Sequence, residues 1–429
     1  MLQTTEETEL TMPSDFRWHS FLVSAGYLPD TSIIVIALIA VCLTAISNLV
    51  ERKDSKIKYR DFFRQSKTLD VLFLGSSHAI DSIYPMELWH DYGIASYNMG
   101  GHGNRMPTNY VVLREALNYS SPKLVVIDCF NISSDRMYSD SIEQAHLSLD
   151  AFPLTYGKVQ GIHELIQDRN LEKEFLWDFV TYHNRWDSLT MNDFVPDYSV
   201  EKGAEMNVNV AAPNAVSPLS PNIKFEENTN GTAYLEKIIE LCQENRIEVL
   251  LTYLPFPSSA SDQAEANRVN DIAQKYDVKY INFLELDDVV NYETDCLDEA
   301  SHLNPSGGRK ITDYLGTYIQ NNYEIEFRTC DWSSDYAKYT AYKLSLLQGE
   351  NNLRNYLMLL YDKNLSYAIK INATCEVMDD PLIQKLLYNL NSEYTITSMD
   401  SNIDFSIDVF SENKLIDTAQ FDNSSRIRE

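Results

Sequence analysis

Two things are scarce in this chain of 429 residues, and each scarcity excludes a class of function. Positive charge is outnumbered, because 35 Lys and Arg face 63 Asp and Glu, which gives a net charge of −28. Phosphate backbones would be repelled, so nucleic-acid binding is disfavoured. Closely spaced cysteines are also missing, since none of the six forms a C-x-x-C pair of the metal-binding kind. We expect no metal site, and no motif calls for another cofactor.

Charge is absent altogether from residues 31–50, although Asp30 and Glu51 bracket this stretch. Twenty apolar or small residues match the hydrocarbon thickness of a bilayer. A cleaved signal peptide fits less well, because a mostly polar or acidic leader (residues 1–30) replaces the usual short basic start. We predict a single membrane-spanning helix over residues 31–50, with a buried core helix as the alternative.

The charges that flank this apolar stretch bear on its orientation. Only Arg17 precedes it, whereas seven cations follow it within residues 52–67. They are Arg52, Lys53, Lys56, Lys58, Arg60, Arg64 and Lys67. The positive-inside tendency would therefore keep the large C-terminal part in the cytoplasm, although long domains can cross a membrane despite such charges.

An alternation of strands and helices begins at residue 69, after a charged linker over residues 51–68 that could be helical. Short apolar runs indicate strands at residues 70–74, 94–97, 124–129, 248–254 and 278–283, with helical patterns between them. Strands that alternate with helices imply a parallel sheet covered on both faces. We therefore predict an α/β fold with a three-layer α/β/α arrangement and about five parallel strands in flavodoxin-like order.

Two further segments depart from the alternation. Residues 132–230 consist of short helical pieces and polar loops, and we interpret them as an insertion into an α/β domain that spans residues 69–330. Residues 331–429 show helical patterns at 336–347, 352–360 and 381–390, and strand patterns at 367–371 and 403–410. They predict a small α+β appendage, in which we find no chemistry.

The candidate chemistry begins where the first strand ends, at residues 75–78 (Gly-Ser-Ser-His). A serine after a strand-end glycine sits in a tight turn that exposes its hydroxyl, and it needs a base within hydrogen-bond reach. His302 is the candidate base, since it lies in a polar string just before a helix. Asp298 or Glu299 could reach its Nδ1 and fix the tautomer, and both remain open. The plainer alternatives are an ordinary serine-rich turn and a histidine in a polar loop.

Acyl transfer also needs donors for a developing oxyanion. Gly100, Gly101 and Gly103 follow the second strand, where bare backbone N–H groups can approach a substrate. Asn131, just beyond the third strand, is the natural side-chain donor, although it could simply cap a turn. His78 and His102 are expected at the same mouth as substrate-binding side chains. Their spacing specifies no metal site.

This set of residues resembles the SGNH/GDSL hydrolase superfamily over roughly residues 60–330. The resemblance places Ser77 at the nucleophile position of Gly-Asp-Ser, with Ser76 in place of the usual Asp. Residues 98–103 (Asn-Met-Gly-Gly-His-Gly) place Gly103 at the second-block glycine, with Gly100 as alternative. Asn131 is the nearest candidate for the third-block asparagine, although Gly-x-Asn-Asp is absent.

The last block of the resemblance is residues 302–307, where His302 stands as the family's histidine. The family's acid lies three residues before it, where this chain has Glu299, while Asp298 stands one residue further away. Asp298 is the commoner residue type in this role and is slightly favoured. The block is similar to a membrane-anchored branch that includes the D-alanine transfer protein of lipoteichoic acid synthesis and envelope polysaccharide O-acetyltransferases. The amino-acid sequence of residues 70–128 and 182–186 is also similar to that of SGNH-like proteins of anaerobic gut Firmicutes.

The resemblance implies a membrane-anchored serine esterase or O-acyltransferase that acts on cell-envelope carbohydrate or an acylated envelope polymer. Its catalytic domain would lie outside the cytoplasm, against the tendency of the flanking charges. A membrane acyltransferase is a candidate partner. Two alternatives remain open, a non-catalytic accessory of a polymer-modification system and a membrane-tethered scaffold. The sequence does not decide between hydrolysis and transfer, because both use the same groups.

Overall fold

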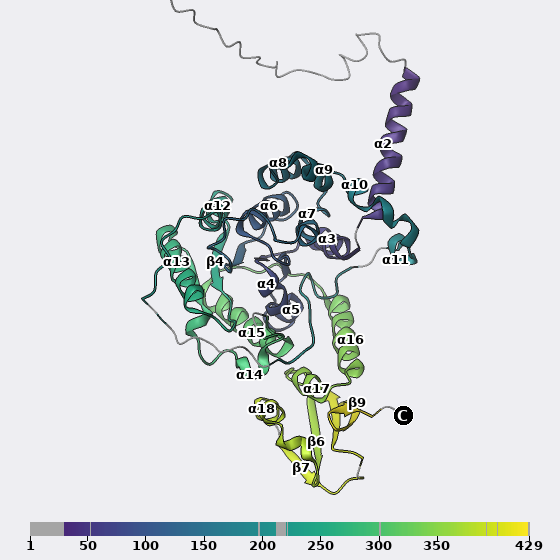
Figure 1. Ribbon diagram of the computed structural model, residues 1–429, viewed down its shortest axis with the longest axis vertical. Helices are drawn as coiled ribbons and strands as arrows, with labels where there is room; N and C mark the ends of the chain where they lie inside the picture. Colours follow the sequence, from purple (N-terminus) through teal and green to yellow (C-terminus); the bar gives the residue numbers. More distant parts are fainter. Residues whose placement is uncertain are drawn as a thin grey trace, which may run out of the picture. The chain divides into compact units, whose positions relative to one another are not determined.

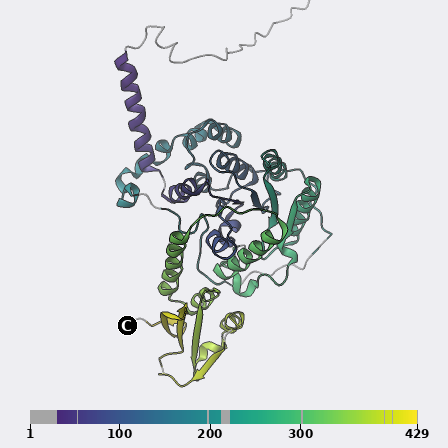
Figure 2. The same ribbon diagram turned by 180° about the vertical axis from the view of Figure 1, so that it is seen from behind.

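The computed structural model describes residues 30–427, except 52, 196–197, 212–219, 221, 300–301, 392 and 401. The predicted leader, apart from Asp30, lies outside the described residues. The chain forms two compact units. One combines the N-terminal part up to Glu51 with residues 177–194, and the other comprises residues 52–176 and 195–429. Figures 1 and 2 show the elements of both units.

The centre of the larger unit is a parallel sheet of five strands. The strands are β1 (Val71–Leu74), β2 (Ser96–Asn98), β3 (Leu124–Asp128), β4 (Glu248–Tyr253) and β5 (Lys279–Asn282). They pair in the order β2-β1-β3-β4-β5, and every neighbouring pair is parallel. This is the flavodoxin-like order, in which ligands bind beyond the carboxyl ends of the strands. The predicted α/β fold is confirmed.

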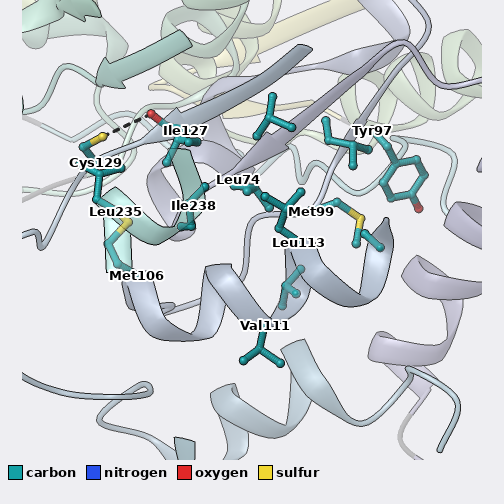
Figure 3. Packing of buried hydrophobic residues seen from close by; sticks show 14 of the residues in the cluster. Leu74, Tyr97, Met99, Met106, Val111, Leu113, Ile127, Cys129, Leu235 and Ile238 are labelled. Atoms are coloured by element: carbon teal, nitrogen blue, oxygen red, sulfur yellow. Dashed lines mark hydrogen bonds between the residues drawn. The ribbon is translucent and has the colours of Figure 1, made fainter. Parts of the chain in front are cut away.

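Successive strand residues point to opposite faces of this sheet, and each face has its own core. Leu72 and Leu74 face α6 (Met106–Ala116) and α12 (Asn230–Glu244), whereas Val71 and Phe73 face the other side. Figure 3 shows the first of these cores, in which Leu74, Leu113 and Ile238 are among the packed side chains. Helices on both faces bury β1, β2 and β3 completely, as is typical of parallel sheets, whereas β5 at the edge is partly exposed.

The remaining helices of this domain follow the alternation. Short α4 (Ser77–Ser82) and α5 (Pro85–Tyr92) lie between β1 and β2, and α13 (Ala260–Tyr276) lies between β4 and β5. After β5 come η2 (Phe283–Glu285), α14 (Tyr292–Asp295) and α15 (Pro305–Asn322). Ile311, Leu315 and Ile319 of α15 are fully buried against the second face. This apolar stripe of α15 covers that face of the sheet.

Residues 53–65, within the expected charged linker, form a helix that belongs to the core. This helix, α3 (Lys53–Gln65), buries Tyr59 and Phe62. The Nζ of Lys58 donates to the carbonyl oxygen of Gly100 at 2.6 Å, and the hydroxyl of Tyr97 donates to the carbonyl oxygen of Lys58 at 2.6 Å. The aromatic residues explain the packing, because Tyr59 and Phe62 lie three residues apart and therefore on the same face of α3.

The insertion contains several helices between residues 142 and 194, and its described residues 198–211 and 222–229 are loops. It contains α7 (Ile142–Leu149), α8 (Tyr156–Leu165) and α9 (Arg169–Leu176). α7 and α8 pack against α6, and so extend the helical layer on that face. The pieces that follow, α10 (Asp178–Tyr182), η1 (His183–Ser188) and α11 (Met191–Phe194), belong to the other unit.

The appendage has a second sheet with its own apolar core. Helices α16 (Ser333–Gly349), α17 (Leu353–Leu359), η3 (Glu376–Asp379) and α18 (Pro381–Asn389) accompany it. Its strands are β6 (Ser366–Asn372), β7 (Tyr394–Thr397), β8 (Phe405–Ser411), β9 (Lys414–Asp422) and β10 (Ser425–Arg426), in the order β10-β9-β8-β6-β7. The predicted α+β character is confirmed. β7 and β9 were not predicted, because both are largely exposed and lack a clear apolar alternation.

The smaller unit is built on one long helix, α2 (Asp30–Val50). Residues 32–50 of this helix have a mean hydropathy of 2.7 and only 12% of the stretch is buried, so its length and composition would allow it to cross a membrane. α10, η1 and α11 contact this helix. Its orientation across a bilayer stays a prediction.

Candidate active site

The turn after β1 places Ser77 at the start of a helix. A Cβ atom on Gly75 would lie 2.9 Å from the Cβ atoms of both Ala79 and Asp128, so this close approach requires glycine. Ser76 then caps α4, because its Oγ accepts a hydrogen bond from the backbone N–H of His78 at 3.3 Å. Ser77 is consequently the first residue of α4, where its own N–H has no partner within the helix.

The side chain of Ser77 meets His302, although 225 positions separate them in the chain. The distance between Ser77 Oγ and His302 Nε2 is 2.7 Å, which is a short hydrogen bond. Ser77 is half-buried, and the side chain of His302 is 26% exposed. A base within this distance can take the hydroxyl proton while the site remains open to a substrate.

Asp298 lies on the opposite edge of the His302 ring. Its Oδ2 is 2.5 Å from His302 Nδ1, and its Oδ1 accepts from the backbone N–H of His302 at 3.2 Å. Holding Nδ1–H in this way leaves Nε2 as the acceptor toward Ser77. Glu299, the alternative acid, is exposed. The loop therefore brings together Ser77, His302 and Asp298.

The loop that carries His302 is fastened at its base. The backbone N–H of Leu297 donates to the carbonyl oxygen of His302 at 2.8 Å, which closes the loop on itself. Asn304 then caps α15 by accepting from the N–H groups of Ser306 and Gly307, while its own amide donates to Thr294 O at 2.8 Å. These bonds limit the positions that the His302 ring can take.

The glycines after β2 have different surroundings. A Cβ on Gly100 would lie 3.1 Å from the carbonyl oxygen of Ser76, so Gly100 lies against the start of α4. Its N–H donates to Asn98 Oδ1 at 3.1 Å, and that of Gly101 donates to the carbonyl oxygen of Gly75 at 3.2 Å. A Cβ on Gly103 would collide with Ser139 and Gln144 instead. Gly100, rather than Gly103, thus adjoins the serine turn.

Asn131 has a left-handed backbone, with a φ of 65°. It is half-buried, and its carbonyl oxygen accepts from the N–H of Ser134 at 3.1 Å. This turn conformation is one that asparagine tolerates better than most residues. The described contacts establish its role in the turn, and its role as an oxyanion donor stays a prediction.

His78 is buried beside the serine–histidine pair. Its ring stacks on Phe130 with a centroid distance of 3.9 Å, and it lies 5.5 Å from the ring of His302. Burial, together with the neighbouring His302, lowers the pKa of His78 to about 3. His78 is therefore neutral at physiological pH, and it can offer an N–H group without adding charge.

His102 has other partners. Its Nε2 lies 3.2 Å from both carboxylate oxygens of Glu205, and this hydrogen bond raises the pKa of His102. The pair lines a cavity of about 720 Å³ that also contacts Gly100, Gly101 and Lys58. Lys58 and Glu201 are two further ionisable side chains of this cavity that burial affects. Burial lowers the pKa of Lys58 to about 8 and raises that of Glu201 to about 8.

Several residues at the site carry no signal in the sequence. Phe130 and Phe256 enclose His78, and Asp128 is buried behind Gly75 with its pKa raised to about 7 by burial. Glu201 lies in the insertion, far from any motif. In the part of the chain that the structure describes, no group of three or more His, Cys, Asp or Glu side chains could hold a metal ion.

No family model matches this chain, and no curated protein is similar to it in sequence. Solved structures of similar shape include a candidate acylhydrolase from Bacteroides fragilis, with 12% identity and a TM-score of 0.31 over 61% of this chain and 94% of that one. A candidate G-D-S-L lipolytic protein from Desulfitobacterium hafniense has 13% identity and a TM-score of 0.30, over 58% of this chain and 97% of that one. A GDSL-like lipase from Bacteroides thetaiotaomicron has 11% identity and a TM-score of 0.30, over 61% and 90%.

Proposed function

We propose that this protein is a membrane-anchored SGNH-type serine esterase or O-acyltransferase that acts on cell-envelope carbohydrate. One observation carries the proposal, namely the chain of contacts from Ser77 Oγ through both ring nitrogens of His302 to Asp298, at 2.7 Å and 2.5 Å. This arrangement suits nucleophilic acyl transfer, because it provides a nucleophile, a base and a group that orients the base.

In the proposed reaction Ser77 Oγ attacks the carbonyl carbon of an ester while His302 Nε2 accepts its proton. Asp298 stabilises the imidazolium that forms. His302 then gives the proton to the departing alcohol, which leaves an acyl group on Ser77. The backbone N–H of Ser77 is a candidate donor for the oxyanion, and the side chain of Asn131 is a second one, whereas the N–H of Gly100 already donates to Asn98 Oδ1.

Water or a sugar hydroxyl would then attack the acyl-enzyme, which gives hydrolysis or transfer. The cavity beside Gly100 supports a polyhydroxylated acceptor, because it is lined by the His102–Glu205 pair, Lys58 and the raised-pKa carboxyl of Glu201. Such groups form hydrogen bonds with hydroxyls of a polar ligand. Anchoring rests on the apolar helix α2, and the extracytoplasmic side follows from the family resemblance alone.

The test is hydrolysis of p-nitrophenyl acetate by the full chain in detergent. Ser77→Ala should remove the activity, and a fluorophosphonate should label the wild type but not this variant. Ser345→Ala, on the exposed surface of α16, is the matched control and should behave as the wild type. Activity that persists in Ser77→Ala would contradict the proposal, and a wild type that is neither active nor labelled would favour the accessory alternative.

A further inference from the structure

Residues 177–194, here named the collar, form a structural unit with α2 rather than with the domain in which they are inserted. The collar consists of α10, η1 and α11. All three pieces contact α2, and Figures 1 and 2 show α10 and α11 beside the end of that helix. A segment over 120 residues away in sequence thus returns to the helix that we propose to span the membrane.

The collar is bonded to the last turn of α2. The guanidinium of Arg185 donates to the carbonyl oxygen of Val50 at 2.7 Å and also to that of Glu51. The last carbonyl groups of an α-helix lack the N–H donors of a following turn, and a cation at this end also suits the helix dipole. The N–H of Phe179 donates to Ser47 Oγ at 3.1 Å. These bonds fix the height of the collar along α2.

Asp193 holds the guanidinium in this position. Its Oδ1 lies 3.1 Å from Arg185 Nη2, and its side chain is 1% exposed. The same carboxylate accepts from the backbone N–H of Thr190 at 2.7 Å, so it also fastens the start of α11. The side chains of Arg185 and Asp193 are therefore directed toward the end of α2 and toward each other.

The apolar side chains of the collar are exposed instead. Trp177 is 59% exposed, Trp186 72%, Met191 72% and Phe194 60%. Soluble surfaces rarely gather so many large apolar side chains, and such a patch marks an interaction site. Tryptophan in particular collects where a membrane meets water. The charges of the segment are three Asp and one Arg, so attraction to anionic lipid cannot explain the patch.

The position of the collar along α2 matches the expected depth of the bilayer surface. The 21 residues of α2, at a rise of about 1.5 Å per residue, extend about 30 Å, which is the thickness of the hydrocarbon core. The exposed apolar side chains of α2, from Ile34 to Ile46, occupy the body of the helix. The end of α2 to which Arg185 binds would therefore reach the headgroup boundary.

We propose that the collar lies in the interfacial layer of the bilayer, with Trp177, Trp186 and Phe194 between the headgroups and the acyl chains. The partner is the lipid surface on the side where the chain leaves α2, and binding is apolar rather than electrostatic. This inference rests on the proposed membrane span. It gives the chain a second membrane contact, formed by the insertion.

The experiment uses the full chain in phosphatidylcholine vesicles whose acyl chains carry bromine either near the glycerol end or near the methyl end. Bromine quenches tryptophan emission at short range, so the two lipids report depth. We expect stronger quenching by the shallow bromine. The double variant Trp177→Phe with Trp186→Phe should lose most of that quenching, and added phosphatidylglycerol should not be required.

The matched control is Trp89→Phe with Trp332→Phe, which leaves the collar tryptophans in place. Trp332 is 3% exposed and Trp89 packs against it within the larger unit, so this variant should keep the shallow quenching. The contribution of Trp18 is common to both variants. Equal quenching in the two double variants would overturn the proposal, and collar tryptophans shielded from bromine and from water would indicate a protein partner and overturn it too.

Extraction of the membranes with alkaline carbonate separates this inference from the span on which it rests. A chain that resists extraction while its collar tryptophans are not quenched would leave the span standing and contradict the collar. A chain that is extracted would overturn both. Resistance to extraction together with collar-dependent quenching is the result that we expect.

Discussion

Two histidines of this chain are each paired with an aspartate four residues away, yet their surroundings are opposite. His302 Nδ1 lies 2.5 Å from Asp298, and these side chains are 26% and 42% exposed. His146 Nδ1 lies 2.8 Å from both oxygens of Asp150, and these side chains are 4% and 1% exposed. His146 also stacks on Phe175, with ring centroids 3.8 Å apart.

A histidine–aspartate pair alone therefore does not make a catalytic site. His302 lies at the carboxyl edge of the parallel sheet with Ser77 at 2.7 Å, where a substrate can approach. His146 is enclosed between α7 and α9, so its hydrogen bonds contribute to stability. The same chemistry therefore predicts loss of activity in one case and loss of stability in the other.

The largest expected effect is loss of activity in His302→Ala. Without the base, Ser77 Oγ keeps its proton, and the ester-hydrolysis rate should fall by about 10³-fold or more. The measurement is kcat for p-nitrophenyl acetate, alongside a thermal unfolding curve. His146→Ala is the matched control, and it should keep most of its kcat at a temperature where it is folded. Equal losses of kcat in the two variants would contradict the claim that His302 acts in catalysis and His146 does not.

The next effect concerns the acid. Asp298→Asn should leave the fold intact but lower kcat by about 10²- to 10⁴-fold, because the wrong tautomer of His302 is then favoured. Glu299→Gln, one residue away and exposed, should change kcat little. Steady-state kinetics of both variants at the same pH decide between the two acids. A large effect of Glu299→Gln would show that the loop closes differently in solution.

The buried pair should give an effect on stability. His146→Ala removes one hydrogen-bond partner of the buried Asp150 side chain, which should lower the free energy of unfolding by about 1 to 3 kcal/mol. His302→Ala, whose side chain is partly exposed, should lower it by less than about 1 kcal/mol. Urea unfolding of the two variants makes the comparison, and a reversed order would contradict the assignment of roles.

The last effect concerns the carboxyl of Asp128, whose charged form is disfavoured by burial. Burial raises the pKa of Asp128 to about 7, whereas an unfolded Asp titrates near about 4. Between these values the folded chain holds a proton that the unfolded chain has released, so stability falls as pH rises from about 4 to about 7. The contribution is fully present below about pH 4.

Asp128→Asn cannot titrate, so it should lack this fall. Its Tm relative to that of the wild type should increase between about pH 4 and about pH 8. Measuring Tm across this range for both proteins tests the prediction. Parallel Tm curves would mean that Asp128 is charged in the folded protein.

Sequence patterns predicted the sheet because its strands are local features. Residues 124–127 form a continuous apolar run, and such runs occur where a parallel strand is covered on both faces. A local pattern also identified Ser77 as a candidate, because a glycine and a serine at a strand end predict a tight turn. Aromatic residues of α3 carried an amphipathic pattern too, yet the many charges of residues 51–68 suggested a linker.

Sequence patterns were therefore sufficient to predict the parallel α/β fold and the apolar helix α2. They also identified the two parts of the candidate site, the serine turn and the histidine loop, as separate segments. Three contacts could be found only in the folded chain. Asp298 rather than Glu299 contacts His302, and Gly100 rather than Gly103 adjoins the serine turn. Arg185 binds the end of α2. The physical reason is range. Secondary structure follows from neighbours a few residues apart, whereas these contacts depend on the paths of loops and helices that bring distant residues within about 3 Å.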